Sequence, residues 1–255
     1  HIIFNLHQPF IFWNWLLTFS NKQKTIFHVI VHDIVEFNTS NYPSIIISNN
    51  NSIISNSDNV IIHDGLNSFK HIYGASKKII SLPFPSRLPY NNSKPIINSK
   101  YYYIPGQYRL EKGFDFVIKY WPIDKTKILV ISTKLPEELH TILKLKNNIL
   151  YKPHLAKSNH FQNLITNSFA CIMMYSSGTN SGVLTTLIAN NVRCLVSNID
   201  MFKNHDQSSE FILSELNEKY FLESLSLLEN KEKPKYINPL EESKKYVHFL
   251  KSLEC

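Results

Sequence analysis

One stretch constrains the fold of this chain more than any other: residues 101–134, which read YYYIPGQYRLEKGFDFVIKYWPIDKTKILVISTK. It begins with a short aromatic strand, continues through a loop, and then carries apolar residues at helical spacing between 113 and 120. A second apolar strand follows and ends at Lys134. The order strand, helix, strand predicts a βαβ unit with two parallel strands.

Positive charge gathers at the loop and strand ends of this unit. Arg109 and Lys112 lie in the loop before the helix, and Lys134 ends the second strand. In an open parallel sheet, ligands bind outside the carboxyl ends of the strands, where loops and helix N-termini converge. Cations beside a helix N-terminus suit an anionic group, most simply a diphosphate. The spacing is equally compatible with solvated loop charges, so both interpretations stay open.

Strands and helices alternate along the whole chain. In the first part, strands are expected at 1–8, 25–33, 59–64 and 77–85 and helices at 10–19 and 66–74. The pattern then restarts, with strands at 100–104, 127–133, 148–152, 169–174 and 192–197 and helices at 113–120, 136–144, 158–167 and 181–190. Two further helices are expected at 211–230 and 241–253. This alternation predicts an α/β fold with doubly wound parallel sheets.

A change of composition separates the two halves. Residues 86–99 are rich in Pro, Asn and Ser and show no period, as a linker does. We therefore predict a Rossmann-like domain at 1–90, a linker at 91–99, a second Rossmann-like domain at 100–209 and C-terminal helices at 210–255. Because the first residue is His1 rather than Met, the sequence is expected to begin inside a longer gene product, with a short or truncated N-terminal domain.

Charge and cysteine usage exclude several classes of protein. The formal net charge is +7, but no block of five or six cations occurs, so a nucleic-acid partner is not indicated. The positive excess fits an enzyme with anionic substrates, or one that rests against anionic lipid headgroups. Three distant cysteines predict reduced thiols of an intracellular protein, not disulfides or a metal site. The N-terminal apolar stretch is too interrupted for a membrane span or a signal peptide.

Several short motifs occur in an order that resembles glycosyltransferase family 4, in particular its branch with a GQIRPYKG, AGKP and NSG signature. The matching segments are Gly106-Gln107-Tyr108-Arg109 with Lys112-Gly113, then Ser132-Thr133-Lys134-Leu135-Pro136, then Asn180-Ser181-Gly182. The passages FHVIVHDI, NVIIHDGLNSFKHIYGASKKIISLPFP and TTLIANNVRCLVSN are also similar to the family's pattern. The resemblance covers nearly the whole chain. It implies a GT-B fold, in which two Rossmann-like domains face each other across a cleft.

The resemblance also implies roles for individual residues. Lys112 matches the family's lysine, and Arg109 is the expected arginine, two positions later than usual, where this chain has Gln107. These cations would neutralise the diphosphate as it leaves, which lowers the barrier to breaking the glycosidic bond. Other donor contacts are expected from Gly106, Gln107, Lys134, Thr179, Asn180, Ser181 and Gly182. The family's two glutamates would fall near Gly178 and Thr186, so both are missing.

Histidines at strand ends are candidates for the first domain's contribution. His32, followed by Asp33, is expected to end a strand and to bond the donor sugar or the acceptor hydroxyl. His63 with Asp64 is a rival, His7 is a weaker one, and a structural role stays open for each.

The leading hypothesis is a retaining, metal-independent glycosyltransferase of hexosyltransferase type. It would use no cofactor beyond its nucleotide-sugar substrate, and would transfer the sugar to a glycan or lipid-linked acceptor for capsule, exopolysaccharide or lipopolysaccharide. We expect a cytoplasmic protein, with the aromatic segment 10–19 packed inside the N-terminal domain or in peripheral contact with the inner face of a membrane. The missing carboxylates support an alternative, a non-catalytic GT-B-like binding or regulatory partner. A nucleotide-sugar epimerase is a third possibility.

Overall fold

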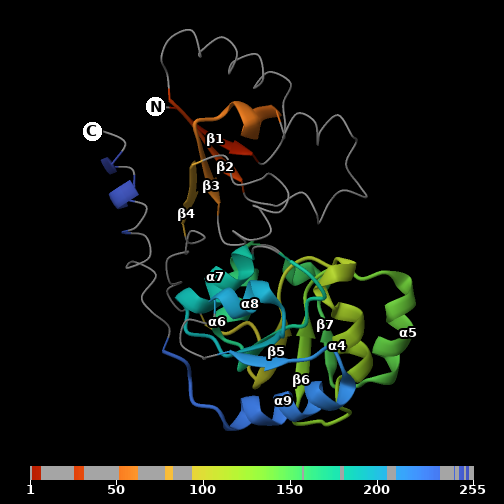
Figure 1. Ribbon diagram of the computed structural model, residues 1–255. Coiled ribbons are helices and arrows are strands. Elements are labelled where there is room, and N and C mark those ends of the chain that lie inside the picture. The colour runs from red at the N-terminus through yellow and green to blue at the C-terminus, as the bar shows by residue number, and fades with distance from the viewer. Residues whose placement is uncertain are drawn as a thin grey trace. The chain divides into compact units, whose positions relative to one another are not determined.

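The computed structural model describes residues 2–6, 26–31, 52–62, 78–82, 94–156, 158–178, 181–205, 211–235, 244, 247–249 and 251–252. The chain divides into two compact units, one formed by His1–Pro85 with Glu242–Cys255 and the other by Ser86–Glu241 (Figure 1). The predicted boundaries differ from this division at two places. Residues 91–99, expected as a separate linker, belong to the second unit, and residues 242–255 group with the first.

The first unit contains a four-stranded parallel sheet in the order β1-β2-β3-β4. Its strands are β1 (Ile2–Leu6), β2 (Phe27–Val31), β3 (Asn59–Ile62) and β4 (Lys78–Ser81), and each lies inside a predicted strand. A short helix at 52–56, which the sequence analysis did not predict, precedes β3. The helices expected at 10–19 and 66–74 lie outside the described residues.

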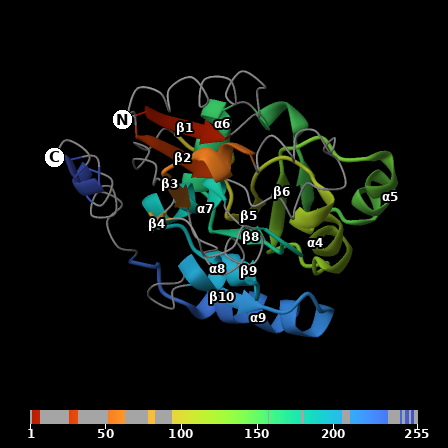
Figure 2. The ribbon, with the colours of Figure 1, turned by 45° about the horizontal axis from the view of Figure 1, so that its top comes forward.

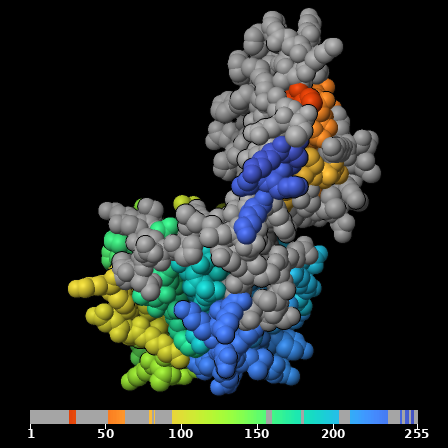
Figure 3. Space-filling view, turned by 90° about the vertical axis from the view of Figure 1, so that its left-hand side faces the viewer, coloured from red at the N-terminus to blue at the C-terminus, as the bar shows by residue number. Residues whose placement is uncertain are grey.

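Contacts within the first unit connect segments that are distant in sequence. The backbone N–H of Phe27 donates to Asp58 Oδ2 at 2.7 Å, which ties the start of β2 to the residue before β3. The ring of Phe249, near the C-terminus, packs edge-on against His28 with centroids 6.0 Å apart. Figure 3 shows these C-terminal residues, in dark blue, beside the orange and gold segments of the same unit. This contact explains why the end of the chain belongs to the first unit.

The second unit contains a six-stranded sheet in the order β10-β9-β8-β5-β6-β7, and all its pairings are parallel. The strands are β5 (Tyr101–Ile104), β6 (Ile128–Ile131), β7 (Ile149–Tyr151), β8 (Ala170–Met173), β9 (Cys194–Ser197) and β10 (Ile212–Ser214). Numbered within the unit, this is the 3-2-1-4-5-6 order of the Rossmann fold. The direction of winding therefore reverses between β5 and β8, and ligands bind at that switch point.

Helices cover both faces of this sheet (Figure 2). Side chains alternate along a strand, so Tyr101 and Tyr103 face one layer while Tyr102 faces the other. The first layer contains α6 (Ser158–Thr166), α7 (Gly182–Ala189) and α8 (Asp200–His205). The second contains α4 (Phe114–Tyr120), α5 (Glu137–Leu145) and α9 (Glu218–Asn230). The predicted doubly wound sheet is confirmed, and the predicted helices between 113 and 190 are found within one or two residues.

The main difference from prediction lies at 211–217, where a helix was expected. Ile212–Ser214 instead form β10, which pairs with β9 at the edge of the sheet. The helix α9 begins only after Asn217, whose side chain accepts a hydrogen bond from the Lys219 N–H and so caps it. The short elements η3 (Leu110–Lys112), η4 (Pro153–Ala156) and α8 were not predicted. Among the described residues, no helix is long and apolar enough to cross a membrane.

Candidate functional site

Two loops meet at the switch point of the six-stranded sheet, one after β5 and one after β8. The Ser176 N–H, from the loop after β8, donates to Glu111 O at 2.8 Å, which ties this loop to η3. Gly113 begins α4 with φ of +66°, and a Cβ on it would lie 1.8 Å from Met174 O. Only glycine fits this close approach of two backbones. The two loops are therefore held in fixed contact at the carboxyl edge of the sheet.

Lys112 is held between these loops and the first turn of α7. Gly106 has φ of +96°, and a Cβ on it would lie 3.0 Å from Lys112 Nζ and 3.6 Å from Val183 Cγ2. The lysine is only 9% exposed, and its Nζ lies 5.8 Å from the centroid of the Tyr175 ring. The ammonium group therefore lies beside the amino end of α7, whereas the sequence predicted it beside the helix that follows its own loop, α4.

The Lys112 side chain is largely buried, and its ammonium group has no carboxylate or carbonyl partner among the described residues. No hydrogen bond or ion pair to it occurs among the described residues, because Glu111 pairs with Arg109 instead. Burial, assisted by the charge of Arg109 and opposed by that of Glu111, lowers the pKa of Lys112 from 10.5 to about 8. A cation this poorly compensated is suited to bind an anion.

The amino end of α7 offers backbone donors at the same place. Ser181 is the N-cap, and its hydroxyl accepts from the Leu184 N–H at 3.3 Å. The N–H groups of Gly182 and Val183 lie in the first turn, where no preceding turn supplies a carbonyl. Together with the helix dipole, they favour an anionic ligand.

The ring of Tyr175, two residues after β8, also lies beside the Lys112 ammonium group. Its side chain is 4% exposed, and its hydroxyl lies close to the Ser181 side chain. The ring packs against Phe202, with centroids 5.4 Å apart, and the Tyr175 carbonyl accepts from Ser197 Oγ at 2.6 Å. Burial raises the pKa of Tyr175 to about 12, and a side-chain hydrogen bond with Ser181 and the charge of Arg109 oppose this increase. The hydroxyl is therefore protonated at neutral pH.

The predicted site residues fall into three groups. Gly106, Lys112, Ser181 and Gly182 lie together at the switch point. Arg109, Gln107 and Lys134 lie at the same edge with exposed side chains, and Arg109, 60% exposed, forms an ion pair with Glu111 at 2.9 Å. His32, Thr179 and Asn180, like the rivals His7 and His63, lie outside the described residues.

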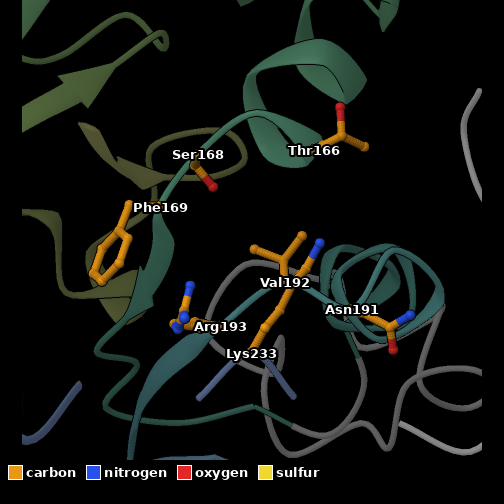
Figure 4. Close-up of a pocket in the computed structure, with 7 residues that line it drawn as sticks. All are labelled: Thr166, Ser168, Phe169, Asn191, Val192, Arg193 and Lys233. Atoms are coloured by element: carbon orange, nitrogen blue, oxygen red, sulfur yellow. The ribbon is translucent and has the colours of Figure 1, made fainter. Parts of the chain in front are cut away.

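A hollow of about 140 Å³ lies at the opposite edge of the same sheet. Figure 4 shows Ser168 and Phe169 on one side of it and Arg193 and Lys233 on the other. Ser168 and Arg193 come just before β8 and β9, so the hollow lies at the amino edge, away from the switch point. Within the described part of the chain, no three His, Cys, Asp or Glu residues are grouped closely enough to hold a metal ion.

Solved structures show which fold this is. The chain matches the pneumococcal O-GlcNAc transferase GtfA in complex with UDP and GlcNAc, with a TM-score of 0.66 and 12% identity over 98% of this chain and 56% of that one. It matches Anabaena HepE in complex with UDP and glucose, with a TM-score of 0.65 and 10% identity over 94% and 75%. WaaG, a glycosyltransferase involved in lipopolysaccharide biosynthesis, matches with a TM-score of 0.58 and 10% identity over 86% and 73%.

These similarities identify the fold as the GT-B fold of glycosyltransferases, as the sequence resemblance implied. No family model and no curated protein matches the chain. The chain spans 57% of the matched chain in the GtfA/B complex and 64% of a sucrose-phosphate synthase.

Proposed function

We propose that the second unit binds the diphosphate of a nucleotide sugar and that the chain belongs to a glycosyltransferase. One observation carries the proposal: at the switch point of a Rossmann-type sheet, the ammonium group of the largely buried Lys112 lacks an acceptor among the described residues and lies beside the amino end of α7. Fixed positive charge at a helix N-terminus is well suited to a diphosphate. The fold of GtfA and HepE, whose structures contain UDP, supports the same choice of ligand.

The proposed reaction is transfer of a sugar to a glycan or lipid-linked glycan, with retention of configuration and without a metal. Negative charge develops on the leaving phosphate as the glycosidic bond breaks. Lys112 and the first N–H groups of α7 would stabilise this charge without reorganising, because the folded chain already fixes them. Arg109 would contribute at longer range, since its guanidinium is exposed and bound to Glu111. Synthesis of capsule or lipopolysaccharide on the cytoplasmic face of a membrane is the proposed setting.

Nucleotide binding is the first test, measured by calorimetry with UDP, GDP and ADP. The variant Lys112→Met removes the charge but keeps a side chain of similar length, and should weaken binding of the preferred nucleotide about tenfold or more. The matched control is Lys146→Met. Lys146 is also 9% exposed, but its Nζ donates to two carbonyls far from the site. Equal affinities for wild type and Lys112→Met would contradict the proposal.

One feature favours a second candidate, a binding partner without catalytic activity. The positions expected to hold the family's glutamates carry Gly178 and Thr186, and the Thr186 hydroxyl donates to Gly182 O inside α7. Neither residue offers a carboxylate to a sugar or a ribose. Release of free nucleoside diphosphate from a nucleotide sugar in the presence of acceptor distinguishes the two. Tight binding of a nucleotide sugar, with no release of nucleoside diphosphate whichever acceptor is supplied, would favour the non-catalytic binding partner.

A further inference from the structure

Cations without an acidic partner gather at the amino edge of the six-stranded sheet. The helices between its parallel strands run back toward this edge, so their last turns lie there with the residues just before each strand. The cations at these positions that form no ion pair among the described residues are Lys100, Lys119, Lys125, Lys144, Arg193 and Lys233. The lysines among them are all exposed, and Arg193 is partly buried.

Acidic side chains offset only part of this charge. Within the described part of the chain, those at the amino edge belong to Asp124, Glu229 and Glu232. Lys127 Nζ lies 3.7 Å from Asp124 Oδ2 and 2.6 Å from Glu229 Oε1, so these two carboxylates are already paired with a cation. The edge therefore keeps a net positive charge.

Two large aliphatic side chains are exposed to water at the same edge. Ile123 follows α4 and is 74% exposed, and Leu145 ends α5 and is 75% exposed. Lys146 Nζ donates to Trp121 O at 2.6 Å, and Asn148 Nδ2 donates to the carbonyls on either side of Ile123, at 2.8 and 2.9 Å. These bonds join the loop that carries Ile123 to the loop that follows Leu145. The two exposed aliphatic residues therefore lie on neighbouring loops that are bonded to each other.

Exposed lysines beside exposed aliphatic side chains fit a membrane surface that contains anionic lipids. Anionic headgroups attract the ammonium groups, and aliphatic side chains gain free energy when they leave water for the boundary of the hydrocarbon layer. A nucleic acid would also attract cations, but its recognition relies on arginine and on aromatic rings that stack on bases. The Phe169 ring at this edge is already contacted by Lys100 and Arg193, at 3.8 and 4.8 Å from its centroid.

We propose that the amino edge of the second unit docks onto a membrane surface that contains anionic lipids, with Ile123 and Leu145 entering the headgroup layer. The nucleotide site proposed above lies at the opposite edge of the same sheet, so docking leaves that site open to solution. The inference goes beyond the proposed function and does not depend on it. It assigns a membrane contact to the second unit, whereas the sequence suggested the aromatic segment 10–19.

Vesicle flotation tests the role of the aliphatic residues, with an equal mixture of phosphatidylglycerol and phosphatidylcholine compared with phosphatidylcholine alone. At low salt, the full chain should bind the anionic vesicles about tenfold more tightly or better, and high salt should remove this preference. The double variant Ile123→Ser, Leu145→Ser should bind them about tenfold more weakly. Its melting temperature should not fall, because both side chains are exposed. The matched control is Leu110→Ser, which alters a side chain 77% exposed at the carboxyl edge and should bind normally.

The same assay tests the cations. Replacing Lys119, Lys125 and Lys144 together with glutamine should weaken binding to the anionic vesicles roughly hundredfold, at about fivefold for each lysine. The control variant has the same net charge and replaces lysines of the carboxyl edge with glutamine, namely Lys134, Lys152 and Lys219. Its binding should stay within about threefold of wild type, because these lysines face away from the proposed bilayer.

Four results would overturn the proposal. The full chain could bind both kinds of vesicle equally, or the Ile123→Ser, Leu145→Ser variant could bind like wild type. Equal losses in the two lysine variants would mean that net charge alone drives binding. If the amino-edge lysine variant lost binding to a single-stranded oligonucleotide but not to vesicles, the edge would be a nucleic-acid surface instead. Nucleotide affinity should be unchanged in every amino-edge variant, so the docking and the proposed function can fail separately.

Discussion

The two edges of the six-stranded sheet use the same residue types in opposite ways. At the carboxyl edge, the Lys112 side chain is largely buried, and its ammonium group makes no hydrogen bond or ion pair among the described residues. At the amino edge, Lys146 is just as buried, but its Nζ donates to Lys119 O and Trp121 O, at 2.6 Å each, and so closes the carboxyl end of α4. Burial alone therefore does not distinguish a binding residue from a structural one. The absence of a hydrogen-bond partner does distinguish the two.

The hollow at the amino edge supports the same distinction. Its hydroxyls are already bonded, since Thr166 donates to Gln162 O and Ser168 to Ile165 O. Lys233 is exposed to water, which solvates its charge at no cost to folding. Asn148 Oδ1 lacks a partner at this edge, but the amide nitrogen of the same residue donates to three carbonyls. The polar groups named at the amino edge therefore have partners within the fold or in water, apart from Asn148 Oδ1, whereas the Lys112 ammonium group at the carboxyl edge makes no hydrogen bond or ion pair among the described residues.

The largest expected effect concerns the backbone contact that builds the carboxyl edge. Gly113→Ala should lower the free energy of unfolding by about 4 kcal/mol or more, because the new Cβ overlaps Met174 O and φ is positive. Gly178→Ala is the control, since its Cβ would come too close only to the flexible end of Met201, at 2.9 Å, and would make ordinary contact with Tyr175 Cδ2, at 3.8 Å. Urea denaturation measures both. Similar stabilities for the two variants would show that the loops at this edge are not in fixed contact.

The two buried lysines should differ in stability as well as in binding. Without ligand, Lys146→Met should lower the free energy of unfolding by about 2–3 kcal/mol, because two buried carbonyls lose their donor. Lys112→Met should leave it unchanged or raise it by about 1 kcal/mol, because a cation without an acceptor is replaced by an apolar side chain. Chemical denaturation at neutral pH is the measurement. If both variants lose stability equally, Lys112 stabilises the fold as Lys146 does, and the proposed difference between the two edges is wrong.

Much of the second unit could be predicted from sequence, because its strands are short apolar runs and its helices carry a clear period. The strands β5 to β9 all lie inside predicted segments. The prediction of a helix at 211–217 was wrong, because the apolar residues there fit a helix as well as a strand. Pairing with β9 makes Ile212–Ser214 a strand. Which strand neighbours which also depends on contacts that no local pattern contains.

The site was predicted only in part for a related reason. Spacing and motif placed Lys112 near a helix N-terminus, but only the fold shows that it is buried and lacks an acceptor. Arg109 was the expected arginine, two positions later than the family's pattern, and its side chain is exposed and paired with Glu111. The motif does not encode this local ion pair. Hydrogen-bond satisfaction is a tertiary property, so sequence alone does not give it.

Nucleotide affinity should depend on pH through Lys112. Because the pKa of Lys112 in the folded chain is about 8, the ammonium group loses its proton as pH rises, and affinity should fall about tenfold between about pH 7 and pH 9. Stability without ligand should change in the opposite direction. Between about 8 and 10.5 the unfolded chain holds the proton more tightly than the folded one, so the lysine's contribution to the free energy of unfolding rises with pH.

The difference between wild type and Lys112→Met isolates this dependence, because every other titrating group, including the nucleotide phosphate, is common to both. Calorimetry and thermal melting across this pH range provide the two curves. If the wild-type and Lys112→Met affinities stay in constant ratio from pH 7 to pH 9, the lysine does not titrate at the site.

The smallest effect is expected at the hollow. Lys233→Ala removes an exposed charge that makes no ion pair or hydrogen bond within the described part of the chain, so it should change the free energy of unfolding by less than about 0.5 kcal/mol. Its effect on nucleotide affinity should be similarly small, because the hollow and the switch point lie at opposite edges of the sheet. The charge change equals that of Lys112→Met, so this variant also tests whether net charge alone drives binding. If Lys233→Ala weakened nucleotide binding as strongly as Lys112→Met, attraction by the overall positive charge of the unit would explain both effects. Lys112 would then not be a specific binding residue, and the two edges would not differ in function.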